Sequence, residues 1–561
     1  MLACLLPPGT IARRGGRPGL VDFFRMDRRR LVRSANPGYH PPTSSMRSLS
    51  FILPAVLLAL TACTSAPRDP GRVVLAIDSP PETLDRRMAL GFNAERLALL
   101  VTPGLTRIDE HGRASPELAA SYEAEGELRW VFRLRPDLRF SDGSTLDAED
   151  VVATFRSLLD PALGSPLRSS YNYLRAVSAR DPLTVIFDLN RPFGAMPVDA
   201  TLGILPSEVV GAEHLDQVRL RPIGAGPFLV RAWDGGDTVL LDPNPTYFRG
   251  APELALEIRT VRDETTRILE LRKGRVDVFL GTMSPPLLPA LREERGLEVK
   301  VGPGAGVSYL LFNVEDPVLS SRELREAVAL ALDREALARF KFKGAATVAD
   351  SLFWAEHWAF ASGLPTYRHN LQRARELLDA AGFPDPGDGR PRLTLSLKTS
   401  TDRFRRSVGL AMASQLAEAG IRIDLQSLEW GTFLGDAKRG NFQLAVLKWP
   451  AVVDPDILRY AYHSSSIPTE ATAWGGGNRM RYRNAALDSL LEEGRESTSS
   501  EERVRIYAEA QRILARDLPA LPLLHENVVG VYADDLEGVV VDPQGSMHSL
   551  ARIRRSGEAK R

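Results

Sequence analysis

The chain of 561 residues is too long for one compact core, so two or three subdomains are expected. Lysine plus arginine equals aspartate plus glutamate at 71 each, and no long run of like charge occurs, which argues against an extended nucleic-acid surface. The only cysteines are Cys4 and Cys63, so a body without disulfides must rely on large apolar cores.

A signal for export is predicted at residues 46–62. Met46-Arg47 supplies a positive start, and the stretch "SLSFILPAVLLALTA" that follows carries no acidic or basic side chain. Its apolar core, from Phe51 to Leu60, is too short to span a bilayer as a helix, which takes about 20 apolar residues. These features and the small residues at the end are typical of a secretory signal peptide.

Residues 1–45 precede this signal and do not fit it. They are basic, rich in proline and serine, and lack a helical apolar stripe. We interpret them as disordered or as the product of a misassigned start, with translation beginning at Met26 or Met46, and we leave them out of the fold prediction.

The last four residues of the signal, Leu60-Thr61-Ala62-Cys63, resemble the bacterial lipoprotein signal. The resemblance implies that Cys63 is diacylated on sulfur and becomes the N-terminus after cleavage, with residues 63–70 as a tether. Each buried CH₂ contributes about 0.8 kcal/mol and one chain holds only marginally, so two or three acyl chains anchor firmly. The alternative is an ordinary signal with an incidental thiol, and both interpretations lead to export.

The body begins with a predicted strand at 71–78, "GRVVLAID", which is rich in β-branched residues. Further strands are predicted at 128–134, 181–190 and 237–244, and in the first of these Leu128, Trp130, Phe132 and Leu134 alternate on one face. The glycine-rich stretch "GPGAGVSY", 302–309, lacks the Lys-Ser/Thr of a phosphate loop. We expect it to be a loop between lobes.

Helices are predicted where a capping residue precedes an apolar stripe. Asp147 is the expected N-cap of a helix that carries Val151 and Phe155 on its apolar face. The other predicted helices are one with a capping box at Ser320 and Glu323, one from Asn370 closed by Gly382, and one capped by Ser499 and Glu502 that extends to about Arg516. Strands and helices alternate without a repeat, which indicates a mixed α/β protein of several lobes.

No motif in the sequence points to catalysis. There is no His-Glu-x-x-His, no pair of cysteines with metal-ligand spacing and no Gly-x-Ser-x-Gly. Glu356 and His357 are adjacent in "WAEHWAF", and we interpret them as core packing or pocket wall. We therefore expect no enzyme, no cofactor and no metal site, although a spatial triad cannot be read from sequence.

Several segments carry motifs that follow one another in a set order. The most specific is "WVFRLRPDLRFSDGSTLDAEDVVATF", 130–155. Others are "RPIGAGPFLV" followed by "NPTYFRG", then "SYLLFNVEDP", "LREAVALALDRE" and the block that starts "YRNAALDSLLEEG". Taken in chain order, these segments resemble the solute-binding proteins of ABC importers, in particular the large peptide- and nickel-binding family, and the resemblance covers nearly all of 71–553.

The resemblance implies an α/β fold of the periplasmic-binding-protein type, a type II two-lobed clamshell of the large class with an extra subdomain. Lobe I would comprise 71–105, 180–302 and 520–553, the small extra subdomain 106–179, and lobe II 303–519. Such a clamshell closes around a solute by hinge motion.

The implied function is capture of a small solute, peptide-like or other, for delivery to the permease subunits of an ABC importer. The implied protein is a monomer in the periplasm or cell envelope, held to a membrane by its lipid and without a nucleic-acid partner. Two alternatives stay open: a sensory protein of the same fold that presents its ligand to a receptor, and, with less support, a hydrolase.

The resemblance also places an aspartate three residues after a cleft tryptophan, where it pairs with a peptide's ammonium group. In "LKWPAVVDPDILRY" Trp449 matches the tryptophan, but Val452 stands at the aspartate position. Either Asp454 has taken the role or the amine anchor is absent, and we expect absence. Asp454 and Asp456 could instead cap the following helix.

Other positions implied to line the cleft are apolar or aromatic. Leu311, Val446 and Ala437 stand where some peptide binders carry charged groups, so we expect free short peptides to bind poorly. Trp430 and Trp449 align with cleft tryptophans, and Tyr309 and Tyr171 are further candidates for stacking on a ligand. The alternative for all four aromatic residues is core packing.

Overall fold

The computed structural model describes residues 69–556. The signal peptide predicted at 46–62, the lipid attachment predicted at Cys63 and the segment 1–45 lie outside the described residues. Within 69–556, no helix has both the length and the apolar character that crossing a bilayer requires.

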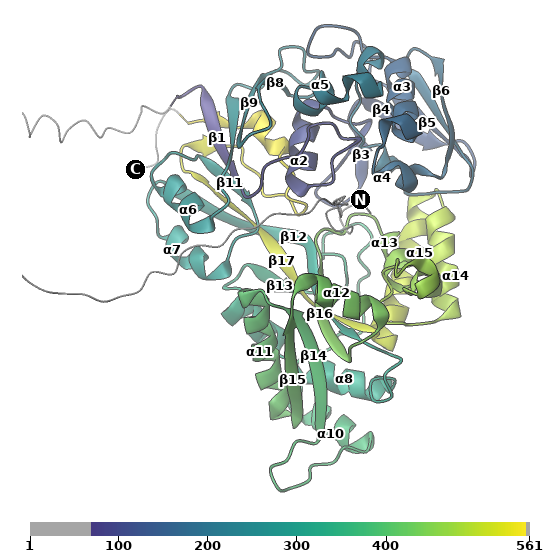
Figure 1. The fold of residues 1–561 in the computed structure, drawn as a ribbon, viewed down its shortest axis with the longest axis vertical. Helices are drawn as coiled ribbons and strands as arrows, with labels where there is room; N and C mark the ends of the chain where they lie inside the picture. The colour runs from purple at the N-terminus through teal and green to yellow at the C-terminus, as the bar shows by residue number, and fades with distance from the viewer. Residues whose placement is uncertain (1–68, 557–561) are drawn as a thin grey trace, which may run out of the picture. The chain divides into compact units, whose positions relative to one another are not determined.

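One sheet of eleven strands runs through both lobes (Figure 1). The strand order is β15-β14-β16-β12-β17-β11-β1-β10-β9-β8, and β13 pairs with β17 off this path. The bounds are β1 Arg72–Ile77, β8 Phe228–Ala232, β9 Thr238–Pro243, β10 Ala255–Thr260, β11 Val278–Gly281, β12 Leu297–Phe312, β13 Ala346–Val348, β14 Leu393–Ser400, β15 Ile421–Leu428, β16 Leu444–Trp449 and β17 Ala520–Ala533. The strands predicted at 71–78 and 237–244 are confirmed as β1 and β9.

Strands β12 and β17 pass from one lobe to the other. They are antiparallel partners from Leu297 and Ala533 at one end to Leu311 and Ala520 at the other. In lobe I, β17 also pairs with β11, and in lobe II, β12 also pairs with β16. The two strands therefore join the lobes through backbone pairing that is interrupted where the register shifts.

The expectation of a loop at 302–309 is wrong, because these residues lie inside β12. The pairing register shifts between Gly302 and Gly306, which marks a bulge at the crossing. A Cβ on Gly306 would lie 2.7 Å from the carbonyl oxygen of Pro450, and one on Gly304 would overlap the carbonyl oxygen of Glu526. The glycines let other backbone segments of the protein approach the strand closely. The segment is therefore extended although its composition is typical of a loop.

The extra subdomain is built on a separate four-stranded sheet in the order β4-β5-β7-β6, with α3 packed on it. The bounds are β4 Ala119–Ala124, β5 Arg129–Leu134, β6 Leu174–Asp181, β7 Thr184–Leu189 and α3 Ala148–Leu159. The boundary expected at 179 falls within β6 and assigns β7 to lobe I, whereas β6 and β7 form one hairpin in this sheet. Trp130, Phe132 and Leu134 are buried as predicted, but Leu128 precedes the strand and is 44% exposed.

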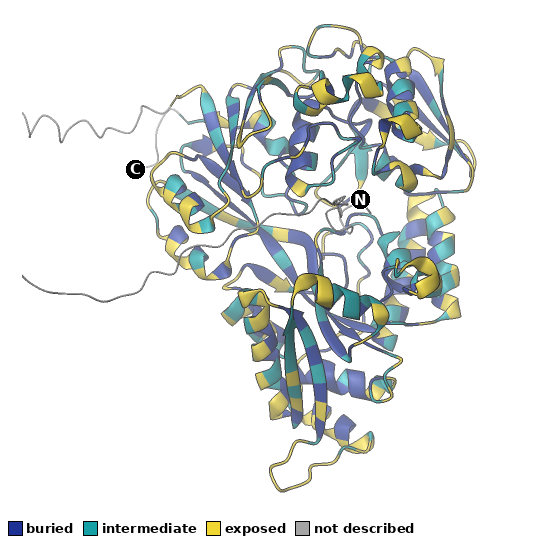
Figure 2. Ribbon diagram, viewed as in Figure 1, coloured by how far each residue is buried: buried dark blue, intermediate teal, exposed yellow. Residues whose placement is uncertain are grey.

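Helices cover the faces of the main sheet and leave its strands largely buried (Figure 2). The helices before the crossing are α2 Phe92–Val101, α4 Met196–Asp199, α5 Leu215–Leu220, α6 Glu264–Arg272 and α7 Leu288–Arg292. Those of lobe II are α8 Arg322–Ala331, α9 Arg334–Ala336, α10 Leu371–Ala380, α11 Arg403–Glu418, α12 Trp430–Arg439, α13 Ile457–Tyr462, α14 Ala485–Glu496 and α15 Ser500–Asp517, with a π-helical turn at Leu337–Lys341. Two short pairs, β2 Thr106–Ile108 with β3 Ala114–Pro116 and β18 Leu536–Glu537 with β19 Arg554–Arg555, complete the strands.

The predicted caps are confirmed at Asp147, Asn370 and Ser499, each of which accepts a hydrogen bond from the first turn of its helix. The cap of α8 is Ser321 and not Ser320. Ser321 Oγ accepts a hydrogen bond from the Leu324 N–H at 3.2 Å, whereas Ser320 Oγ donates to the Pro317 carbonyl. The two serines are adjacent in sequence. The helix begins directly after Ser321, so it is the Ser321 side chain that reaches the first-turn N–H groups.

Gly224 and Gly226 hold the connection before β8 against α2. Both have negative φ, so a left-handed backbone is not the reason for glycine. A Cβ on Gly224 would overlap the carbonyl oxygen of Val101, and one on Gly226 would overlap that of Leu100. The end of α2 and this connection are therefore in backbone-to-backbone contact.

Gly224→Ala should destabilise the protein by about 1–3 kcal/mol, because the added methyl forces two backbone segments apart. Urea unfolding measures the effect. The matched control is Gly435→Ala in α12, where the nearest atom to a new Cβ is the mobile end of Arg439, so no loss of stability is expected. Equal stability of the two variants would contradict the contact.

Candidate functional site

A cavity of about 750 Å³ lies between the two lobes. Lobe I contributes the start of α6 and the segment that follows β11. Lobe II contributes the turn before β13, the end of β14, the first turn of α11, the start of α12 and residues of β16 and β17. The charged lining residues are Glu264, Asp402, Arg405, Lys448 and Glu526, and the large apolar and aromatic ones are Met283, Leu337, Phe342, Phe404, Val408, Trp430, Val446, Leu447, Leu523 and Leu524.

The first turns of three helices, α6, α11 and α12, border this cavity. A helix start carries unpaired N–H groups and a partial positive charge. Each of these starts is capped by a carboxylate within hydrogen-bond distance of a first-turn N–H, supplied by Asp263, Asp402 and Glu429. A solute therefore meets chiefly the side chains of these turns.

An aromatic wall stands on the lobe II side. Trp430 is 46% exposed, an unusual fraction for tryptophan, and lines the cavity. The guanidinium carbon of Arg405 lies 5.4 Å from the Trp430 ring centroid, and Phe404 makes an edge contact with Phe342 at 5.0 Å between centroids. Such a wall suits the planar or apolar part of a ligand.

An ion pair between Lys448 Nζ and Glu526 forms the floor of the site. Lys448 lies on β16 and Glu526 on β17. Both residues also line a second cavity of about 100 Å³, which reaches toward Asp78 and Arg96 in lobe I. The pair thus separates two adjoining chambers. The sequence analysis missed it, because the two residues are 78 positions apart and neither belongs to a motif.

The structure brings only one of the six predicted ligand-binding residues to the large cavity, namely Trp430. Trp449 and Tyr309 are buried and stack on each other with centroids 6.0 Å apart and ring planes at 3°. Their contact joins β12 to β16 inside lobe II. Neither residue lines either of the two adjoining chambers.

Val452 and Asp454 lie in the loop after β16. The Val452 N–H donates to the carbonyl oxygen of Ala305 at 3.0 Å, and the Ala305 N–H donates to Pro543 in lobe I at 2.7 Å. Asp454 pairs with Arg503 of α15, with Oδ1 2.6 Å from Nη2. The Asp456 N–H also donates to Asp454, so this carboxylate is engaged within the fold.

Tyr171 lies in the core of the extra subdomain, among residues that pack between α3 and the four-stranded sheet. Its hydroxyl donates to the carbonyl oxygen of Asp199 at 3.1 Å, and its ring makes an edge contact with Phe155. Of the positions expected to make the cleft apolar, Val446 lines the cavity, whereas Leu311 and Ala437 are buried in lobe II.

His357 is buried where lobe II meets the β2–β3 turn. Its Nε2 lies 2.7 Å from the carbonyl oxygen of Val453, and its Nδ1 accepts from the Ala359 N–H, so both ring nitrogens are engaged in the neutral form. Burial lowers the pKa of His357 to about 4. Its neighbour Glu356 is exposed and outside the cavity. His357 is therefore a packing residue, one of the two interpretations from sequence.

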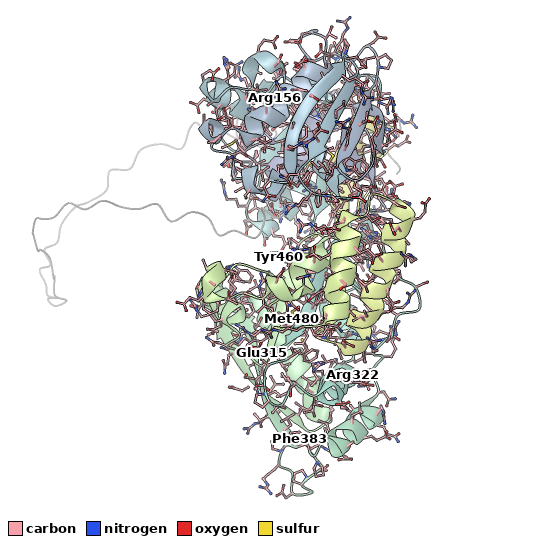
Figure 3. The ribbon with its side chains drawn as sticks, turned by 90° about the vertical axis from the view of Figure 1, so that its right-hand side faces the viewer. Arg156, Glu315, Arg322, Phe383, Tyr460 and Met480 are labelled. Carbon is pink, nitrogen blue, oxygen red and sulfur yellow. The ribbon has the colours of Figure 1, made fainter. Side chains whose placement is uncertain are left out.

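The two lobes also touch away from the cavity, on the flank where α14 and α15 lie side by side (Figure 3). The Gly194 N–H of the connection after β7 donates to the carbonyl oxygen of Arg495 at 2.8 Å. The Trp358 indole N–H donates to the carbonyl oxygen of Gly112 at 3.1 Å. Among the described residues, no group of three or more His, Cys, Asp or Glu side chains is placed to hold a metal ion.

Comparison with known proteins gives a family for this architecture. The model of bacterial extracellular solute-binding proteins, family 5 (middle part), matches residues 113–468. A curated relative is the probable di/tripeptide-binding protein 5 of Pseudomonas aeruginosa, which is 27% identical over 467 residues, covering 77% of this chain and 86% of the relative.

Two solved structures show the same fold. HbpA2 from Haemophilus parasuis superposes with a TM-score of 0.76 at 22% identity, covering 86% of this chain and 100% of that one. The ABC transporter substrate-binding protein CtaP from Listeria monocytogenes gives 0.75 at 24% identity, covering 87% and 100%. The α/β clamshell expected from the sequence is confirmed.

Asp454→Ala should destabilise the protein by about 3–5 kcal/mol, because it leaves the buried Arg503 guanidinium without its counter-ion. Removing both charges in Asp454→Ala/Arg503→Leu should cost less than the single change. Urea unfolding checks both, with Glu123→Ala as the control, since an exposed ion pair such as Glu123–Arg133 contributes little to stability. An Asp454→Ala variant as stable as the control would contradict a structural role for Asp454.

Proposed function

This chain belongs to the bacterial extracellular solute-binding proteins of family 5, and we propose that it holds a small solute between its lobes and delivers it to the membrane subunits of an ABC importer. The observation that carries the proposal is the 750 Å³ cavity with walls from both lobes. Because β12 and β17 are the continuous strands that join the lobes, bending at their bulge changes the width of this cavity.

Within this site we assign ligand contact to Trp430. It is the predicted aromatic residue that lines the cavity, and its large exposed ring loses water contact when a solute packs on it. Trp449 and Tyr309 support the floor by stacking, and Tyr171 holds the extra subdomain together. These three act through the scaffold.

The solute differs from the di- and tripeptides for which the Pseudomonas relative is named. The position expected for the amine-binding aspartate is Val452, and Asp454 is paired with Arg503. Without an acid free to meet the ammonium group in this loop, a short free peptide has no anchor there. We propose a solute that does not depend on that contact.

We further propose that the protein is an extracytoplasmic lipoprotein that acts as a monomer. The predicted signal at 46–62 followed by Cys63 supports acylation of the cysteine. A tethered binder stays close to its permease, which raises the effective concentration of loaded protein at the membrane. A sensory protein of the same fold would also need a receptor, for which no feature of this chain argues.

A thermal-shift screen of organic acids, opines, sugars, metal chelates and peptides against residues 64–561 tests solute capture. A solute that fits should raise the melting temperature, and Trp430→Ala should weaken its affinity about tenfold or more, because the stacking surface is lost. Leu128→Ala, an exposed apolar residue in the extra subdomain, is the control. A calorimetric titration with low-micromolar dipeptide affinity would contradict the expected absence of an amine anchor.

Cys63→Ser should release the protein from membranes into the soluble extracytoplasmic fraction. Replacing the acceptor sulfur prevents acylation, and the affinity from the acyl chains is lost with it. Fractionation of cells with an antibody measures the distribution, and Pro67→Ala, in the tether after Cys63, is the control with an unchanged distribution. Equal membrane retention of both variants would refute the lipid anchor.

A further inference from the structure

Six cationic side chains lie on two segments that contribute to the lobe II wall of the cavity, and one of them, Arg405, lines the cavity itself. Three lie in and just after the π-helical turn that contributes Leu337 and Phe342 to the wall, and three lie in the first turn of α11. The two segments are in contact through the rings of Phe342 and Phe404. We name this cluster the basic rim, and it consists of Arg339, Lys341, Lys343, Arg403, Arg405 and Arg406.

The charge of the basic rim is not cancelled within the described part of the chain, where none of its six side chains is within ion-pair distance of an acid. The acids nearest in sequence have other partners: Glu335 pairs with Arg368, and Asp402 accepts the backbone N–H of Arg405 as the helix cap. Elsewhere in the described residues, many arginines pair with a carboxylate, as Arg249 does with Glu117 and Arg503 with Asp454. The six cations of the basic rim, by contrast, are available to attract an anion.

The basic rim continues into the cavity through Arg405, which lines the wall beside Trp430. Next to it, at the end of β14, is Ser400. This side chain is only 5% exposed and lines the same cavity, and its Oγ has no hydrogen-bond partner. An unpaired guanidinium and a buried hydroxyl without a partner therefore border one cavity wall.

The carboxylates of the cavity do not compensate these donors. Glu264, on the opposite wall, accepts the N–H of Ser284 at 2.7 Å. Glu526 is neutralised by Lys448 on the floor. Asp402 is held at the start of α11 as its cap. Arg405 can only donate and the Ser400 hydroxyl can donate, and a chemical class that accepts from both is an acid.

We propose that the solute is an organic acid with an apolar or aromatic body. Its carboxylate or phosphate group pairs with Arg405 and accepts a hydrogen bond from the Ser400 hydroxyl, while its body packs against Trp430. The other five cations of the basic rim attract it to the mouth of the cavity and raise its association rate. This inference rests on the proposed function and names the class of its solute.

A measurement without the natural solute tests the field of the basic rim. Trp430 is more exposed than the other tryptophans among the described residues, so it dominates collisional quenching of the fluorescence. Iodide should quench it several-fold more efficiently than caesium ion, and Arg339→Gln/Lys341→Gln/Lys343→Gln should reduce this difference. Lys273→Gln/Arg292→Gln/Arg295→Gln, at the far ends of α6 and α7, makes the same change in net charge and should leave the quenching unchanged. Equal quenching by the two ions would overturn the positive field.

Three matched probes test the class of solute: N-acetyl-Glu-Phe-Glu, N-acetyl-Gln-Phe-Gln-amide and N-acetyl-Lys-Phe-Lys-amide. Titration should give the acidic probe at least about tenfold tighter binding than the neutral one, and no binding of the cationic one. Arg405→Gln should abolish the preference. In the triple rim variant, the acidic probe should associate several-fold more slowly at low salt, with an unchanged dissociation rate. In the triple control variant, both rates should be unchanged.

The outcomes separate the inference from the function. Equal affinity for the acidic and neutral probes, or capture of only neutral or cationic solutes, would overturn the inference that the solute is an acid. The proposed solute-binding function would still stand. If no solute of any class stabilised the protein, the proposed function itself would fall. Loss of binding to vesicles containing phosphatidylglycerol in the triple rim variant, with an unchanged association rate of the acidic probe, would assign the rim to membranes and overturn its role in attracting the solute.

Discussion

The pairing of β12 with β17 is the interaction on which the rest of the structure depends. These two strands carry the main sheet from one lobe into the other, and the cavity walls of lobe II are attached to them through β16, β14 and β13. Ala305, in the bulge of β12, is hydrogen-bonded to Pro543 on one side and Val452 on the other. Because backbone hydrogen bonds are directional, these contacts fix how the walls of lobe II are placed on the strands that continue into lobe I.

The site combines an apolar wall with two kinds of charged side chain: those that form an ion pair within the protein and those that do not. Lys448 and Glu526 neutralise each other at the floor, and Asp454 is held by Arg503 behind the loop. Arg405 has no acid partner among the described residues and faces the same space as Trp430. In a cleft with low-dielectric walls, an unpaired charge acts on a solute far more strongly than a paired one. The unpaired groups therefore determine selectivity, and the paired ones maintain the shape.

Local features were predictable from the chain. Asp147 with Asp150, Asn370 and Ser499 cap their helices as expected, because a cap is decided by residues three or four positions apart. The alternation that buries Trp130 and Phe132 follows from the two-residue period of a strand. The exceptions are also instructive. The glycine-rich segment 302–309 has the composition of a loop, but it forms a strand, and its glycines leave room for other backbone segments to pack closely against that strand.

The sequence by itself determined the fold class, the position of several helices and strands and, through the ordered motifs, the solute-binding family. It also indicated Trp430 as a cleft residue. Only the tertiary structure decided which groups share the cavity, since Lys448 meets Glu526 and Arg405 meets Trp430 across long separations in the chain. It likewise moved Trp449, Tyr309 and Tyr171 into packed cores. The physical reason is that a helix cap or a strand face is fixed by neighbours in sequence, whereas a binding wall is fixed by how strands distant in sequence pair in one sheet.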